Sequence, residues 1–447
     1  MKPFACSSGG ALRRDNQEQF SQVQPMMIPS LPRIALVASM AVCTLALGFA
    51  PATASTSDAG SLNVYLNADM THTTDVGHSL ELGLRAGLVE GADRFGGAPI
   101  QVLVQDHQNN MRRTEQTIMR ASDDPQLLAI VGGMHTPHYL KFGPTINERQ
   151  IVLMLPWSAG GTLTRLANGP DNYIFRLSVD DTKAAPFLVA QAQKKACERV
   201  ATIALDNGWG RGNAASIAKH LQSQNIELVH QSFVRRDAGM DTVGDEMAAI
   251  RGTSPDCVIM VLSPKTSASA ANALLLWDSP PRVLSHWGIL GGGYREIVAE
   301  EVWTALNIAV LSSCVLETPV TRPTQLETAL RAARTIKPSV QNLNDLWSSP
   351  AFAHAYDLGL LLSAAAKQAA KDPRWSEGNL GKKTAIRDAL EALNQSVDGL
   401  LKTYDRPYHT ASATLQDGHE ALHLSDLCLV RMTREGNLEP HNPAEEK

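Results

Sequence analysis

The stretch LLAIVGGMHTPHYLKFGPTINERQIVLMLPWSAGG, residues 127–161, decides the fold. It opens on a short apolar run that predicts a buried strand. Tyr139, Phe142 and Ile146 then recur at helical spacing, which predicts a helix with one buried face. A second apolar run at 151–155 predicts another strand. A strand, a helix and a strand in this order are the unit of a parallel sheet with crossover helices.

The same alternation extends in both directions and then restarts. Short apolar runs predict strands at 62–66, 100–105, 127–131 and 151–155, and then at 199–205, 227–234, 257–262, 282–285 and 307–311. Helices without strands of their own are predicted at 324–335, 349–371 and 384–394, and we expect them to pack on the first sheet. The fold class is therefore α/β, with two doubly wound parallel-sheet lobes joined by a hinge.

The domain boundaries follow from this pattern. We expect a signal peptide with an N-terminal extension at 1–54, and a first lobe built from 61–177 and 315–403. The second lobe comes from 178–314 and 404–436, with a last apolar strand at 427–432, and a flexible tail covers 437–447. Ligands of such sheets bind beyond the carboxyl ends of the strands, so two lobes would face each other across a cleft.

The N-terminal segment has the pattern of an export signal. Arg33 precedes an uncharged apolar run at 34–50, and the small residues of Pro51-Ala52-Thr53-Ala54 follow it. The run is short for a membrane span and polar residues come after it, which favours a cleaved signal over an anchor. We therefore expect a periplasmic protein.

Composition and charge narrow the class of partner. The chain has 447 residues, of which 44% are hydrophobic and 19% charged, and its formal net charge is −5. These values are ordinary for a globular protein of two domains. Both signs of charge are scattered and form no basic stripe, so we expect no nucleic-acid partner.

Four cysteines remain after the signal, at Cys197, Cys257, Cys314 and Cys428. None has the spacing of a metal site or a redox motif. An oxidising periplasm permits a disulfide, and buried free thiols are the alternative. Cys197 and Cys257 lie near the starts of the first and third strands of the second unit. These strands are neighbours in the sheet order 2-1-3-4-5, so a Cys197–Cys257 bridge is the candidate pairing.

Several segments together resemble the type I periplasmic binding proteins, which include leucine/isoleucine/valine-binding and amide-binding proteins. They are the run from 131 to 165, YIFRLSVDD at 173–181, ATIALDNGWGRG at 201–212, PDCVIMVLSP at 255–264 and the RPY…GHEAL pattern within 404–424. Each motif is degenerate, but they follow one another in order along the mature chain.

The resemblance implies a function as well as a fold. It implies a monomeric, non-enzymatic clamp without a cofactor, which captures a small amino-acid-like or amide ligand between its lobes. The clamp would deliver this ligand to the membrane permease subunits of an ABC importer. A ligand sensor of the same fold, acting on a separate signalling partner, is the alternative.

The resemblance also places the ligand on loops that follow strands. The residues it implies are Thr136, Trp157, Ser158 and Ala159 in the first lobe, and Trp209, Ser263 and Trp287 in the second. Hydroxyl groups and backbone N–H groups at helix starts suit a small anion. Binders of α-amino acids usually carry an acidic residue near the position of Trp287, and this chain has none there. The tryptophans enclose part of a ligand or, alternatively, cap hydrophobic cores.

Other kinds of site are not supported by the spacing of residues. Gly208-Trp209-Gly210-Arg211-Gly212 lacks the glycine pattern of a dinucleotide site, and the loop around Ser158 lacks the first glycine of a nucleophile elbow. His107, His135 and His138 suggest a metal only weakly, and we expect them at the surface or at the edge of the cleft. Asp206 ends a strand, where its carboxylate caps the next helix or touches ligand.

The export signal gives the first testable prediction. Cleavage after Ala54 should leave Ser55 as the first residue of the exported protein. N-terminal sequencing of protein recovered from outside the cytoplasmic membrane checks this. An exported form that retains residues 34–50 would contradict it.

Overall fold

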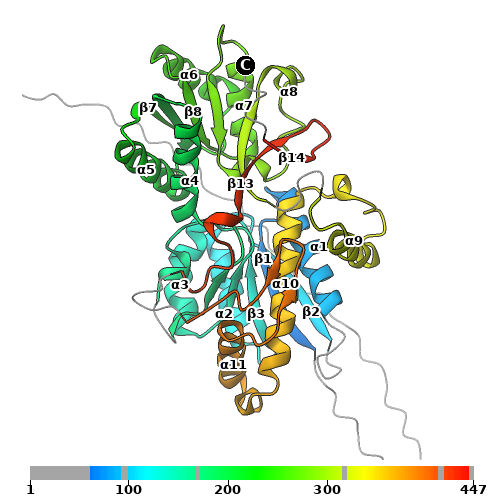
Figure 1. Cartoon of the computed structure of the whole chain (residues 1–447). Coiled ribbons are helices and arrows are strands. Elements are labelled where there is room, and N and C mark those ends of the chain that lie inside the picture. The colour runs from blue at the N-terminus through cyan, green and yellow to red at the C-terminus, as the bar shows by residue number, and fades with distance from the viewer. Residues whose placement is uncertain (1–60, 92–98, 168–170, 315–319, 411–416, 442–447) are drawn as a thin grey trace, which may run out of the picture. The chain divides into compact units, whose positions relative to one another are not determined.

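The computed structural model describes residues 61–91, 99–167, 171–314, 320–410 and 417–441 (Figure 1). The expected signal peptide at 1–54 and the end of the expected tail lie outside these residues. Across the described part of the chain, every helix is too short or too polar to cross a lipid bilayer.

The first lobe is built on a five-stranded parallel sheet with the order β2-β1-β3-β4-β5. Its elements are β1 (Leu62–Ala68), α1 (Thr74–Gly91), β2 (Ile100–Asp106), α2 (Met111–Asp123), β3 (Leu127–Gly132), α3 (Thr136–Glu148), β4 (Leu153–Leu155), β5 (Ile174–Arg176), α9 (Pro323–Ile336), α10 (Ser349–Ala369), α11 (Asn379–Glu391), β11 (Val397–Asp398) and β12 (Thr403–Tyr404).

The second lobe is built on a seven-stranded sheet with the order β14-β13-β10-β9-β8-β6-β7. Its elements are α4 (Asp181–Lys194), β6 (Arg199–Leu205), α5 (Gly208–Ser223), β7 (Glu227–Val234), α6 (Met240–Gly252), β8 (Cys257–Val261), α7 (Pro264–Leu274), β9 (Arg282–Ser285), α8 (Val302–Ala305), β10 (Ile308–Ser313), β13 (Leu427–Met432) and β14 (Leu438–Pro440). The two doubly wound lobes confirm the predicted fold class.

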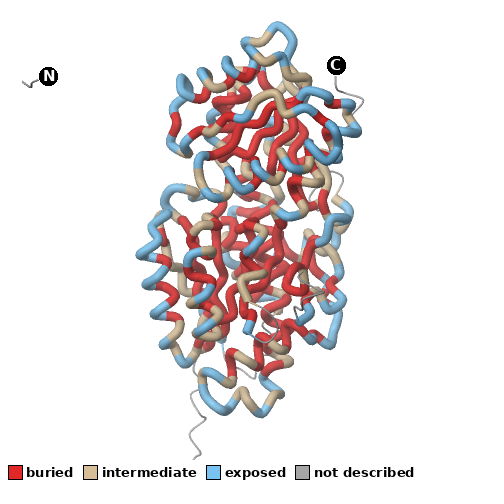
Figure 2. The backbone as a smooth tube through the Cα atoms, turned by 90° about the vertical axis from the view of Figure 1, so that its left-hand side faces the viewer, coloured by how far each residue is buried: buried red, intermediate tan, exposed pale blue. Residues whose placement is uncertain are grey.

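Helices cover both faces of the first sheet, so β1, β3, β4 and β5 are buried on both sides, whereas the edge strand β2 is mostly half-buried (Figure 2). In β1, Val64 and Leu66 pack in the cluster that contains α1 and α10, whereas Tyr65 packs with α2 and α3. The helices α1 and α10 lie directly against each other because α1 carries glycines at the contact. A Cβ on Gly83 would lie 2.3 Å from the carbonyl oxygen of Phe352.

The second sheet carries the predicted pair of cysteines. Its parallel strands have the order 2-1-3-4-5, which places β6 beside β8, and Val200 pairs in register with Cys257. Cys197 and Cys257 form a disulfide with their Cα atoms 5.8 Å apart. The structure therefore contains the bridge that the strand order suggested.

The predicted tail and part of the predicted second lobe need correction. Residues 438–440 form β14, which pairs antiparallel with β13, so this part of the expected tail is ordered in a sheet. The described residues on either side of 411–416, expected in the second lobe, bond to the first lobe instead at Tyr404 and Ala421. The hydroxyl of Tyr404 donates to Asp357, and the Ala421 amide donates to the carbonyl of Arg176.

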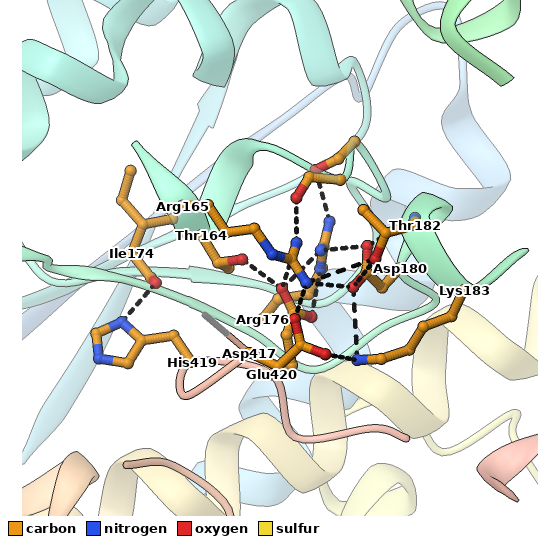
Figure 3. A network of polar contacts seen from close by, with 12 residues as sticks. Thr164, Arg165, Ile174, Arg176, Asp180, Thr182, Lys183, Asp417, His419 and Glu420 are labelled. Atoms are coloured by element: carbon orange, nitrogen blue, oxygen red, sulfur yellow. Dashed lines mark hydrogen bonds and ion pairs between the residues drawn. The ribbon is translucent and has the colours of Figure 1, made fainter. Parts of the chain in front are cut away.

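The reason for this placement is a buried cation at the end of β5. The side chain of Arg176 is fully buried, and it donates to both carboxylate oxygens of Glu420 at 2.8 and 2.6 Å (Figure 3). It also contacts Asp180 at 2.9 Å and the carbonyl oxygen of Gly160 at 2.8 Å. A buried guanidinium requires such partners, so the segment that carries Glu420 must lie on the first lobe.

Further charged groups extend this network toward the surface. Arg165 contacts both Asp180 and Asp417, and Lys183 lies 3.3 Å from Asp417 (Figure 3). Burial would raise the pKa of Asp180, but the guanidiniums of Arg176 and Arg165 outweigh it and hold that pKa well below its usual range. Asp180 therefore stays ionised and completes the neutralisation of Arg176.

The position of this network follows from the path of the chain. The chain passes between the lobes three times: between β5 and α4, between β10 and α9, and just before β13. Arg176 ends β5 and Asp180 caps α4, so both flank the first crossing, while Glu420 precedes the third. One buried cluster thus fastens two of the three crossings.

Removal of one partner from this cluster should destabilise the fold. Glu420→Gln keeps the shape but leaves Arg176 with Asp180 as its only carboxylate partner, and we expect the free energy of unfolding to fall by about 3 kcal/mol. Urea denaturation followed by circular dichroism measures this. Glu327→Gln is the control, because Glu327 pairs with Arg334 at the surface and should cost under about 1 kcal/mol. Equal small losses in both variants would contradict the account.

Candidate functional site

A cavity of about 550 Å³ lies where loops from both sheets meet. In the first lobe, its walls follow β2, β3 and β4, and in the second lobe they follow β6, β7, β8 and β9. All of these loops leave the carboxyl ends of parallel strands, which is where doubly wound sheets bind ligands. The cavity is therefore the candidate binding site.

The structure brings all the sequence-predicted ligand residues to this cavity. Its lining includes Thr136, Trp157, Ser158, Ala159, Trp209, Ser263 and Trp287. The family resemblance implied these residues on loops that follow strands, and the parallel topology explains why residues far apart in the chain converge. Their contact with a ligand stays a prediction.

All three tryptophans line the cavity, but they differ in how deeply they are buried. Trp157 and Trp287 stack on each other with ring centroids 4.3 Å apart, and they are only 4% and 1% exposed. Trp209 is half-buried and stands edge-on to His286, with ring centroids 5.0 Å apart. The stacked pair therefore belongs to the hydrophobic core and also lines the cavity, whereas Trp209 exposes more of its ring to the cavity.

The hydroxyl groups at the site differ in whether their protons already have an acceptor within the protein. Ser158 donates to the carbonyl of Gly133 at 2.7 Å, and Ser263 is 2.9 Å from the hydroxyl of Thr266. Thr136 accepts from the Gly160 amide at 3.2 Å, and among the described residues no acceptor takes the proton of its own hydroxyl. Thr136 is thus the hydroxyl best placed to donate to a ligand.

Thr136 also begins α3, in whose first turn Pro137 has no N–H and the His138 amide donates to the carbonyl of His135. The preceding residue, His135, has a left-handed backbone (φ 78°) and gives α3 no side-chain cap. A non-glycine residue in this conformation is uncommon and occurs often at functional sites. Beside it, a Cβ on Gly160 would lie 2.2 Å from Cγ2 of Thr136, so only glycine brings its amide this close.

Three histidines cluster beside this turn. The ring centroids of His107, His135 and His138 lie 4.9 to 5.6 Å apart. His135 and His138 line the cavity, as expected for histidines at its edge, and Nε2 of His135 is 2.9 Å from Asp69. The expectation was wrong for His107, which is fully buried and does not line the cavity. In the part of the chain that the structure describes, only Cys197, Asp256 and Cys257 have candidate metal ligands close together, and both sulfurs there are in the disulfide.

Sequence reasoning named Asp206 as a possible ligand contact, but it missed the other charged side chains at the rim, Arg235, Arg236 and Asp237. Arg235 contacts both carboxylate oxygens of Asp237, and Asp206 contacts Arg211 at 2.6 Å. Arg236 also lines the cavity, yet it makes no hydrogen bond or ion pair with any residue that the structure describes. The available signal was the position of Arg235-Arg236 directly after a strand, at the same edge as the other site residues.

Burial sets the protonation of the histidines in and near the site. Burial, together with the neighbouring histidine charges, lowers the pKa of His107 to about 3 and that of His138 to about 4. Burial also lowers the pKa of His354 to about 4, against the raising effect of the Pro156 carbonyl that accepts from it. These imidazoles are therefore neutral in the folded protein at neutral pH.

Two doubly wound lobes with a cavity between the ends of their strands define a class of two-lobed ligand-binding proteins. A family model described as periplasmic binding protein matches residues 66–275 of this chain. The resemblance to the type I periplasmic binding proteins is therefore confirmed, in the sequence as well as in the fold. No curated protein gives a significant match.

Solved structures of this family share the fold at low sequence identity. A type 1 periplasmic binding protein from Bordetella pertussis has a TM-score of 0.68 at 15% identity, covering 85% of this chain and 100% of its own. A leucine binding protein from Thermotoga maritima has a TM-score of 0.66 at 13% identity, covering 86% and 99%. A solute binding protein of an ABC transporter from Rhodopseudomonas palustris, in complex with p-hydroxybenzoic acid, has a TM-score of 0.67 at 12% identity, covering 86% and 96%.

The neutral histidines predict a dependence of stability on pH. Their folded pKa values lie below the unfolded value of about 6.5, so the unfolded chain binds more protons below that pH. The stability they contribute is present above about pH 6.5 and is lost as the pH falls toward 4. Each of His107, His138 and His354 should lower the free energy of unfolding by about 2 kcal/mol when the pH falls from 7.5 to 5.

Chemical denaturation at the two pH values measures this loss. His354→Asn should reduce the difference in free energy of unfolding between pH 7.5 and pH 5 by about 2 kcal/mol. His72→Gln, at an exposed position, should leave it unchanged. A free energy of unfolding that is the same at pH 7.5 and pH 5 would contradict the prediction.

Proposed function

We propose that this chain is an extracytoplasmic solute-binding protein, which captures a small solute in the cavity and delivers it to the permease subunits of an ABC importer. The observation that carries the proposal is the cavity of about 550 Å³, which loops from both lobes line at the carboxyl ends of their strands. This volume suits a single small organic molecule.

The way in which both lobes contribute explains how binding would be signalled to a permease. Thr136 and Trp157 come from the first lobe, and Trp209 and Trp287 come from the second. A solute that contacts both lobes binds best when they are closed upon it, and this differential affinity shifts the population toward the closed form. A permease that reads the closed form would then recognise the loaded protein.

Other features of the chain agree with this role. The family model and the similar structures are binding proteins, some with a small acid or amino acid as their ligand, and we propose binding without turnover. A disulfide between Cys197 and Cys257 is suited to an oxidising compartment such as the periplasm. The apolar segment at 34–50 is the proposed export signal.

Uptake by cells tests the transport role directly. A strain that lacks this chain but keeps the importer should lose high-affinity uptake of the solute that binds the purified protein, and expression of the chain should restore it. Unchanged uptake in the deleted strain, with binding intact in the purified protein, would contradict delivery to an importer.

Substitutions in the cavity test the binding site. Thr136→Ala should weaken binding by roughly 1–3 kcal/mol, because a polar group of the solute loses its partner. Trp209→Ala should cost at least as much through lost aromatic contact. Calorimetry with the best-binding solute measures both.

Matched controls lie outside the cavity. Thr304→Ala removes an exposed hydroxyl, and Trp347→Ala removes a ring that is 41% exposed, so neither should change the affinity. Tryptophan fluorescence should respond to solute in the native protein and in Trp347→Ala, and respond less in Trp209→Ala. Affinities unchanged by Thr136→Ala and Trp209→Ala would show that the site lies elsewhere.

A further inference from the structure

We propose that the solute is a small organic acid, with a carboxylate and no ammonium group beside it, and that Arg236 is the charge partner of its carboxylate. This inference rests on the proposed function and names the substrate class of the same cavity. It narrows the amino-acid-like or amide ligand expected from the sequence to one that carries a net negative charge.

Arg236 is a cation that the fold leaves without a partner. It follows β7 at the carboxyl end of the second sheet and lines the cavity, and it is only partly exposed. It makes no hydrogen bond or ion pair within the described residues, although five N–H groups of a guanidinium can donate. Burial lowers the pKa of Arg236, and the negative charge of Asp69 opposes this shift. An anionic ligand would replace the lost hydration.

The acidic groups near Arg236 are already engaged. Asp69 accepts from His135 at 2.9 Å and from the amides of Thr71 and His72 at 3.2 and 2.8 Å. At the rim, Asp237 is paired with Arg235, and Asp206 with Arg211. The one charge at the cavity that lacks a hydrogen-bonded partner among the described residues is therefore positive.

The other polar groups facing Arg236 are neutral or point to the same ligand. His135 and His138 lie close enough for its charge to lower their pKa values, and burial keeps both imidazoles neutral at neutral pH. Thr136 has a hydroxyl proton to donate, and it lies at the positive end of the α3 dipole. A carboxylate between Arg236 and Thr136 would receive hydrogen bonds from both lobes.

The rest of the cavity lining indicates which carbon skeleton the acid would have. The stacked Trp157–Trp287 pair and the side chains of Met134, Leu205 and Leu262 line it, so an aromatic or branched apolar group would be buried there. An ammonium group next to the carboxylate would meet the cation of Arg236 and no available carboxylate. The same skeleton with an α-amino group should therefore bind much more weakly.

A panel of compounds on matched skeletons tests the charge of the solute. Thermal shift and calorimetry would compare benzoate, benzamide and benzylamine, and also 4-methylpentanoate, its amide and leucine. We expect the acids to bind at least about tenfold more tightly than the amides, amines and leucine. Preferential binding of an amide, an amine or leucine would overturn this inference but leave solute binding intact. Binding of none of these compounds would contradict both proposals.

Substitutions at position 236 identify the anchoring group. Arg236→Gln should weaken binding of the best acid by about 10- to 100-fold and remove its advantage over the matching amide. Arg236→Lys keeps the charge and should recover part of both. Arg251→Gln is the matched control, since this exposed guanidinium lies outside the cavity and is already bound to Asp278, and the affinity of the variant should equal that of the native protein.

Stability of the unliganded variants separates binding from folding. Because Arg236 is partly buried without a partner, Arg236→Gln should leave the melting temperature of the unliganded protein unchanged or raise it. A lower melting temperature of Arg236→Gln, with unchanged affinity for the acid, would show that Arg236 is a structural residue and overturn the inference.

Discussion

The ion pair between Arg176 and Glu420 is the constraint on which the arrangement of the lobes depends. Arg176 is fully buried at the end of β5, and its charge requires carboxylates that the first sheet does not supply. One comes from Asp180, where the chain enters the second lobe, and the other comes from Glu420, shortly before the chain crosses for the last time. The neutralisation of Arg176 thereby holds two of the segments that connect the lobes, the one between β5 and α4 and the one before β13. Both lie at the carboxyl ends of the strands of the first sheet.

The two lobes contribute different chemical groups to the cavity. On the first lobe, neutral histidines and the hydroxyl of Thr136 offer hydrogen bonds but no free charge. The second lobe presents the cation of Arg236 and the half-buried ring of Trp209. A solute with an apolar body and a carboxylate would contact Thr136 on the first lobe and Arg236 and Trp209 on the second. A ligand that gains contacts from both lobes only when they are closed favours the closed form.

Much of the fold could be predicted from the sequence, because apolar runs bounded by turn residues are local signals. The predicted strands at 199–205, 227–234 and 427–432 match β6, β7 and β13 at both ends. The short β5 was missed since it ends in Arg176, whose partner Glu420 is 244 positions away and cannot be found by periodicity. The residues of the site also differ in how far they could be predicted: the family resemblance implied Thr136 and the tryptophans, on loops that follow predicted strands. In Arg235-Arg236, only the folded chain shows which guanidinium has a partner.

The central claim is that the cavity binds an organic acid between Arg236 and the first turn of α3. A crystal structure of the complex with the tightest-binding acid of the matched panel tests this claim most directly. The account predicts the carboxylate within hydrogen-bonding distance of both Arg236 and Thr136, with the apolar body against the Trp157–Trp287 pair. A carboxylate that points away from Arg236 into solvent, or a ligand bound in another cavity, would contradict it.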